Sequence, residues 1–139
     1  ILPKKKNYLL KKKQGIADLI EDMDWKSFTI LYENEESLIR LQGVLKLKGP
    51  NDSPIAIRQL DPQDDHRIIL KEIQMSGETH IILQCRPERV LTVLRQAKEV
   101  KMMEDYQSYI ITDLVNNKII FSLSLLPPPS VKFFIMINF

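Results

Sequence analysis

The sequence predicts an α/β protein built around a doubly wound, mostly parallel sheet. Two observations lead to this fold class: four short runs rich in β-branched and aromatic residues recur along the chain, and helix-like runs alternate with them. Strands that alternate with helices are typical of parallel sheets with crossover helices, and the right-handedness of such crossovers leaves few topologies. At 139 residues the chain has the size of a single domain.

The expected strands are short. The third, at residues 79–85, is almost entirely apolar, as a parallel strand covered on both faces should be. The other three have the same β-branched and aromatic bias and lie at residues 27–33, 53–60 and 108–114. Together they predict a sheet with a buried centre.

The first two helices are expected on either side of the first strand. One covers residues 16–23, and the other follows Asn34, which is placed to cap it. Glu35 and Glu36 then fall in the first turn, where negative charge suits the positive end of the helix dipole. Leucines at positions 38, 41 and 45 share one face and predict the buried side.

Two further helices are expected between the later strands. Asp64 and Asp65 are placed to cap the first of these, which should stop at Gly77. The second has Pro87 at its first helical position, which proline favours because it needs no backbone N–H there.

Charge and composition divide the chain into three parts. Residues 1–14 carry six lysines and no acid, so we expect a basic, disordered segment, whereas the remainder has 14 basic and 18 acidic side chains. Residues 15–114 hold all the predicted strands and helices and form the expected domain. Residues 115–139 contain no acidic residue and three consecutive prolines, and we expect them to be an apolar tail outside the domain.

Several classes of partner are not expected. Basic residues are not spread over the predicted domain or interleaved with aromatic residues, which argues against nucleic acid. The longest apolar runs, at residues 119–126 and 131–137, are far shorter than the roughly 20 residues that span a bilayer, so no transmembrane segment is predicted.

The sequence predicts no enzyme, cofactor or metal site. Its four glycines are scattered, so neither a dinucleotide nor a phosphate-binding glycine motif exists. His66 and His80 have no second histidine or cysteine at metal-ligand spacing. We expect His66 to be a polar surface residue and His80 to be a strand residue. Helix capping explains Asp64 and Asp65. Cys85, the single cysteine, closes an apolar strand and is expected to be a buried free thiol.

The ends of the predicted strands supply the candidate site. In open parallel sheets, ligands bind outside the carboxyl ends of the strands. The polar residues at those ends that would face such a cleft are Glu33, Asn34, Arg86, Thr112 and Asp113.

Three stretches of the chain carry a resemblance to a known family: "DWKSFTILYENEESLIRLQGVLK", "IRQLDPQDDHRIILKEI" and "HIILQCRPERVLTVLRQAKEVKMMEDYQSYIITDL". In this order they closely resemble the amino-terminal domain of ionotropic glutamate receptors, most like the kainate-type subunits. The resemblance runs from near Ile16 to Leu114.

This resemblance implies a periplasmic-binding-protein-like (type I) bilobed domain, of which the chain forms most of the second lobe. It implies a place on the extracellular side of the plasma membrane and dimers with other glutamate receptor subunits, which direct assembly of a glutamate-gated cation channel. Glutamate is bound by a separate, later domain in this family, so no glutamate-binding residue is carried over. Cys85 matches an unpaired cysteine at the end of the corresponding strand.

Two alternatives stay open. The first is a ligand-sensing lobe of another type I receptor, such as a metabotropic or natriuretic receptor, with the five candidates facing the cleft. The second is a small intracellular regulator or enzyme of flavodoxin-like shape. That class would need an acidic pocket or a phosphate loop at the strand ends, and the mixed residues there do not favour it.

Overall fold

The computed structural model describes the chain except for residues 1–7, 13–14, 46–54, 105, 113–130 and 138–139. The strands in this part are β1 (Tyr8–Lys12), β2 (Thr29–Tyr32), β3 (Ala56–Gln59), β4 (His80–Gln84), β5 (Ser108–Ile111) and β6 (Lys132–Ile137). They form one sheet in the order β1-β6-β5-β4-β2-β3, and every neighbouring pair is parallel. The predicted α/β class with a parallel sheet is therefore confirmed.

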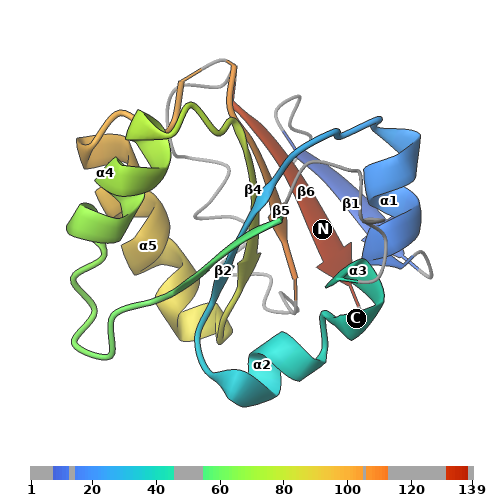
Figure 1. Cartoon of the computed structure of the whole chain (residues 1–139), viewed down its shortest axis with the longest axis horizontal. Helices are drawn as coiled ribbons and strands as arrows, with labels where there is room; N and C mark the ends of the chain where they lie inside the picture. The colour runs from blue at the N-terminus through green and yellow to red at the C-terminus, as the bar shows by residue number, and fades with distance from the viewer. Residues whose placement is uncertain (1–7, 13–14, 46–54, 105, 113–130, 138–139) are drawn as a thin grey trace, which may run out of the picture.

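Helices cover both faces of the sheet (Figure 1). On one face lie α4 (Arg67–Met75) and α5 (Pro87–Glu99). On the other lie α1 (Ile16–Asp22) and the pair α2 (Glu35–Ile39) and α3 (Gln42–Leu45). Two apolar clusters, one under each helix layer, form the core. This two-sided cover is the doubly wound arrangement that the sequence predicts.

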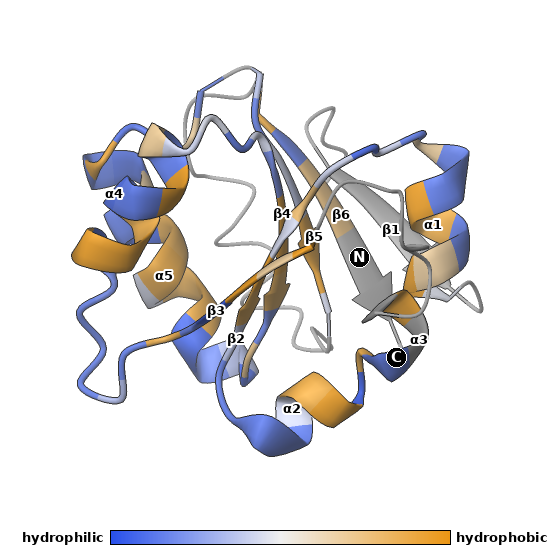
Figure 2. Cartoon of the chain, viewed as in Figure 1, coloured by the Kyte–Doolittle hydropathy of each residue, from blue (hydrophilic) through white to orange (hydrophobic). Residues whose placement is uncertain are grey.

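Side-chain alternation in the central strands produces the two clusters. In β4, Ile81 and Leu83 enter the cluster under α4 and α5, whereas Ile82 enters the cluster under α1 and α3. Successive strand side chains point to opposite faces, so a strand buried on both sides must be apolar throughout. Figure 2 shows this hydrophobic character in the middle of the sheet. The prediction that residues 79–85 are covered on both faces is confirmed.

The two ends of the sheet differ from the expected domain boundaries. Tyr8–Lys12 lies in the segment expected to be disordered, yet it forms β1 and pairs with β6. Lys132–Ile137 lies in the tail expected outside the domain, yet it forms β6 beside β5. Phe133 is buried and its ring lies 5.7 Å from that of Tyr109. The physical reason is that the apolar run completes the open edge of β5, which a boundary at residue 114 would leave unpaired.

The helix after Asn34 is also shorter than expected. Its first part ends at Ile39, and two successive tight turns, Leu41 N–H to the Leu38 carbonyl and Val44 N–H to the Leu41 carbonyl, lead into α3. Leu41 and Val44 are buried by this bend, whereas Leu38 is half-buried. Both side chains enter the apolar cluster under α1 and α3.

Candidate functional site

The carboxyl ends of β2 and β4 meet at the topological switch point of the sheet. β3 flanks β2 on one side, and β4, β5 and β6 continue on the other. Open α/β sheets bind their ligands in the crevice at such a point. A hollow of about 180 Å³ opens there, lined by Glu33, Asn34, Glu36, Ser37, Arg40, Gln84, Cys85 and Arg86. Three of the five candidates, Glu33, Asn34 and Arg86, therefore surround one hollow.

The other two candidates stand apart from the hollow. Thr112 is fully buried, and its hydroxyl donates to the Leu83 carbonyl oxygen over 3.2 Å and contacts the side-chain carbonyl of Gln84. It reaches the hollow only through Gln84, which lines it. Asp113 lies outside the described residues.

Asn34 is occupied as a helix cap. Its side-chain oxygen accepts from the backbone N–H of Ser37 at 2.9 Å, and the Ser37 hydroxyl oxygen accepts in return from the Asn34 N–H at 3.0 Å. The N–H of Glu33 also donates to that hydroxyl, over 3.2 Å. This reciprocal capping box fixes the start of α2, as Asn34 and the acidic first turn predict. The Asn34 side chain is thus committed to the fold.

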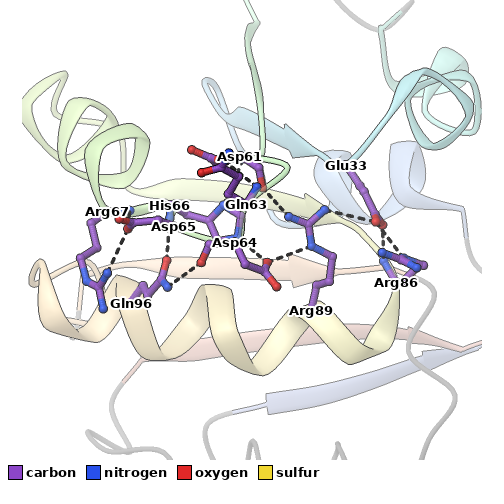
Figure 3. Close-up of polar contacts among 10 residues, drawn as sticks. All are labelled: Glu33, Asp61, Gln63, Asp64, Asp65, His66, Arg67, Arg86, Arg89 and Gln96. Atoms are coloured by element: carbon purple, nitrogen blue, oxygen red, sulfur yellow. Dashed lines mark hydrogen bonds and ion pairs between the residues drawn. The ribbon is translucent and has the colours of Figure 1, made fainter.

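Glu33 is held by two arginines (Figure 3). One carboxylate oxygen accepts from the backbone N–H of Arg86 at 2.9 Å, and the other accepts from Nε of Arg86 at 2.8 Å and lies 3.2 Å from Nη1 of Arg89. The Glu33 side chain is only 8% exposed. Burial by itself raises the pKa of Glu33, but hydrogen bonds from the Arg86 backbone and from the Arg89 and Arg86 side chains outweigh it and hold that pKa below its usual value.

Arg89 joins this pair to the loop before α4, and sequence reasoning did not find it. Its Nη2 donates to the Asp61 carbonyl oxygen at 2.6 Å, and its Nε donates to a carboxylate oxygen of Asp64 at 3.0 Å. The Arg89 side chain is 10% exposed. A signal did exist, because Arg89 lies in the first turn of the helix that begins at Pro87, next to the capping residue Arg86.

The loop from Asp61 to His66 corrects two expectations. His66, expected at the surface, is fully buried: its Nδ1 accepts from the Asp61 N–H at 3.1 Å, and its Nε2 lies 3.0 Å from Asp64 Oδ1. Because a backbone N–H can only donate, Nδ1 must be the acceptor and Nε2 carries the proton. Asp64 is no helix cap, since it has a φ of 64° and bonds His66 and Arg89. Those hydrogen bonds, from His66 first, lower the pKa of Asp64.

Gln96 ties this loop to α5. Its side-chain oxygen accepts from the backbone N–H of His66 at 2.6 Å, and its side-chain nitrogen donates to the Asp64 carbonyl oxygen at 2.9 Å (Figure 3). The N–H of the capping residue His66 is therefore bound by a side chain 30 residues away, whereas Asp65 accepts from the N–H of Arg67, the first residue of α4, at 3.4 Å, as its predicted capping role requires.

Cys85 is a buried free thiol, as the sequence predicts. Burial, with the nearby negative charge of Glu33, raises the pKa of the thiol to about 12. A nucleophilic cysteine needs the opposite shift, because only the thiolate reacts. Cys85 therefore lines the hollow without being an activated nucleophile.

Two features are absent from the described ranges of the chain: a cluster of metal-ligating side chains and a helix able to cross a bilayer. Within them, the acidic, histidine and cysteine side chains form no group of three or more that could hold a metal ion. The same ranges contain no helix with the length and apolar character needed to cross a bilayer.

Comparison with known proteins gives a family match and two named relatives. The family model described as "Receptor family ligand binding region" matches residues 10–128. "Glutamate receptor ionotropic, kainate 1" of Rattus norvegicus is 35% identical over 102 residues, which cover 73% of this chain and 11% of the relative. The Homo sapiens protein of the same name is 34% identical over 102 residues, with the same coverage.

The matched range is broader than the domain expected from the sequence. It begins before residue 15 and continues past residue 114, so it overlaps both segments that were expected to lie outside. The chain nevertheless spans only 11% of the length of the relatives it matches. This family consists of receptor ligand-binding domains rather than enzymes. The chain belongs to the receptor family ligand binding region, and its similarity to kainate-type glutamate receptors identifies it as part of a glutamate receptor amino-terminal domain.

Proposed function

We propose that this chain forms part of the extracellular amino-terminal domain of an ionotropic glutamate receptor subunit, and that it serves subunit assembly of a glutamate-gated cation channel. Family membership and the similarity to two kainate receptor subunits support the receptor. They also support a place on the extracellular side of the plasma membrane. The partners in this proposal are other glutamate receptor subunits.

One observation favours subunit assembly over ligand binding: the polar groups at the switch point already have partners within the chain. Glu33 is bonded by Arg86 and Arg89, and Asn34 is bonded by Ser37. Thr112 is turned to the main chain of β4. A ligand would have to replace these internal contacts, each of which the fold already satisfies. Binding to a partner at the outer faces requires no such exchange.

Exposed apolar side chains mark the outer faces that a partner could cover. Ile68 and Met75, seven residues apart on α4, are 73% and 80% exposed. On the other side of the molecule, Ile39 of α2 and Ile57 of β3 are also exposed. Residues spaced by seven lie on one face of a helix, so α4 presents its two side chains together. Large exposed apolar side chains that gather on one face are typical of protein contact sites.

The experiment is co-expression of the full chain with a kainate-type subunit, followed by affinity capture and sedimentation velocity. We expect the chain to co-purify with the subunit. Two double variants test the two faces: in one, both Ile68 and Met75 are replaced by lysine, and in the other, both Ile39 and Ile57. At least one of these double variants should weaken the association. A Gln63→Lys variant in the exposed loop is the control for added charge. Association that neither pair of substitutions weakens, or no association at all, would contradict the proposal.

A second candidate, a ligand-sensing lobe of a type I receptor, is favoured by the hollow at the switch point. It predicts that a free amino acid raises the melting temperature of the chain saturably at constant ionic strength, whereas pure assembly predicts no change. Assembly and ligand sensing are thus separated by two independent assays.

A further inference from the structure

The helix α4 buries one side and presents apolar side chains on the other. Leu70 and Ile73 enter the core cluster beneath it. On the outward side, Ile68 is 73% exposed and Met75 is 80% exposed. Seven residues make nearly two full turns, so these two side chains lie within about 20° of each other around the helix axis. In Figure 1, α4 lies at the outer left of the molecule, where a second protein could reach this side.

Two opposite charges flank this apolar line. At about 100° per residue, Lys71 and Glu72 fall about 50° to either side of it, and both are exposed. Lys71 has no hydrogen bond or ion pair within the described part of the chain. Glu72 contacts Arg58 of β3, yet half of its side chain stays exposed. We define Ile68, Lys71, Glu72 and Met75 as the α4 stripe: an apolar line with a cation on one flank and an anion on the other.

The α4 stripe is complementary to itself in one orientation. Two copies of a chain usually associate about a two-fold axis, so that each presents the same surface to the other. If the axis runs parallel to α4, the helices are parallel and the positive flank of each copy faces the negative flank of the other. If the axis is perpendicular to α4, the helices are antiparallel, and Lys71 faces Lys71 while Glu72 faces Glu72. Charge complementarity therefore favours the parallel pairing.

We propose that the α4 stripe is a contact between two copies of this chain, with their α4 helices parallel across a two-fold axis. In this contact Ile68 packs on Ile68 of the second copy, and Met75 packs on Met75. Lys71 pairs with Glu72 of the second copy on both flanks, so the dimer gains two ion pairs. An apolar line flanked by such pairs is the arrangement of parallel two-stranded coiled coils.

The pattern favours a second copy over an unrelated partner. Another protein would have to reproduce the same apolar and charged positions in register, whereas a second copy carries them already. The remaining charge of α4 does not compete, because Arg67 is paired with Asp65 and Glu99. With nine residues in α4, the contact is small and the association should be weak and reversible. This inference rests on the proposed assembly role and deepens it by naming a surface and a partner.

The test is charge reversal in the full chain, followed by sedimentation equilibrium at protein concentrations from about 10 µM to about 0.5 mM. We expect the wild type to dimerise reversibly. Lys71→Glu and Glu72→Lys should each weaken dimerisation by about tenfold, because each turns both ion pairs of the dimer into like-charge contacts. The double variant that carries both substitutions exchanges the two flanks and should return to within about threefold of the wild type.

A mixture of the two single variants tests the pairing directly. One variant then carries two glutamates on the α4 stripe and the other carries two lysines, so each repels its own copy and attracts the other. We expect a heterodimer at least about tenfold more stable than either homodimer. A monomeric wild type would overturn the proposal. Single variants that dimerise as well as the wild type, or a double variant as weak as the single ones, would overturn it too.

A matched control separates the contact from a general effect of charge. Glu21→Lys makes the same charge change on α1, on the other face of the sheet (Figure 1), and should leave dimerisation unchanged. Glu72→Lys also removes the contact with Arg58 inside the chain, but the double variant lacks that contact as well, so its recovery cannot come from there.

Salt dependence gives a second measurement if Glu72→Lys fails to fold. Raising the salt from about 0.05 M to about 0.5 M should weaken the wild-type dimer, whose flanks attract, and strengthen that of Lys71→Glu, whose flanks repel. Equal responses of the two chains to salt would overturn the proposal.

All these outcomes are read from the chain alone. A chain that stays monomeric but captures a kainate-type subunit would overturn this inference and leave the proposed assembly role standing. A chain that dimerises through the α4 stripe but captures no subunit would do the reverse.

Discussion

Replacement of Arg89 by methionine should lower the free energy of unfolding by about 3 kcal/mol, because it breaks a buried ion pair from one side. Arg89 is the only arginine of the described chain that contacts both Glu33 and Asp64. Methionine keeps much of the length and apolar volume of the side chain and removes its charge. The variant therefore tests the electrostatic and hydrogen-bonding role of Arg89 with little change in packing.

The magnitude follows from the exposure of the partners. Removing one member of a fully buried pair costs about 3–5 kcal/mol, since the other charge stays buried and unpaired. Glu33 is 8% exposed but keeps Arg86, and Asp64 is 48% exposed and can be solvated by water. The lost bond to the Asp61 carbonyl oxygen adds to the cost. These effects place the expected loss at the low end of the range.

The assay is urea unfolding at pH 7, followed by the fluorescence of Trp25, which is buried and stacks on His80 with ring centroids 4.4 Å apart. The control is Arg95→Met, which makes the same substitution at an exposed position of the same helix and should cost less than about 0.5 kcal/mol. A loss below about 1 kcal/mol for Arg89→Met, or a loss equal to that of the control, would refute the inferred role of the buried network.

Three further predictions concern acid stability, thiol reactivity and the carboxyl-terminal strand. The pKa values of Glu33 and Asp64 are lowered in the folded state. Their contribution to stability is therefore present above their ordinary pKa values of 4.5 and 3.8, and it is lost as the pH falls through the folded-state pKa values. Arg89→Met should make the free energy of unfolding decline less steeply on the acid side. Cys85 should resist a disulfide reagent at pH 8 in the folded chain and react on denaturation, and fast reaction of the native chain would contradict its raised pKa of about 12. Phe133→Ala should cost about 3–5 kcal/mol in urea unfolding, and a change near zero would show that β6 adds nothing to the core.

Much of the fold could be predicted because its central strands carry a strong signal. A strand that enters both core clusters must be apolar where it is covered, and Ile81, Ile82 and Leu83 meet that condition. The ends of the sheet carried a misleading signal. The lysines near Tyr8–Lys12 and the prolines before Lys132–Ile137 argue against order locally, yet pairing partners far away in sequence form strands from both segments. The composition of a segment does not show whether a strand far away in the sequence will pair with it.

The candidate site was predictable only in part. Strand ends indicated Glu33 and Arg86, because parallel strands end at one edge of the sheet. The contribution of Arg89 and His66 was missed, since it depends on how α5 and the loop before α4 approach each other in space. His66 shows the difficulty most clearly: nothing in the sequence distinguishes a surface histidine from one whose two nitrogens are bonded to Asp61 and Asp64.

The hydrogen bonds and ion pairs at the switch point agree with the proposed role of the chain in subunit assembly. A sensing lobe needs polar groups that gain partners when ligand arrives, because differential interaction is what shifts a conformational equilibrium. At this edge Glu33, Arg89 and Asn34 have partners already, and exchange for a ligand would gain little. The same contacts stabilise the junction of β2 with α5 from within. A lobe whose cleft edge is closed by its own side chains is suited to present fixed outer surfaces, and fixed surfaces are what subunit assembly requires.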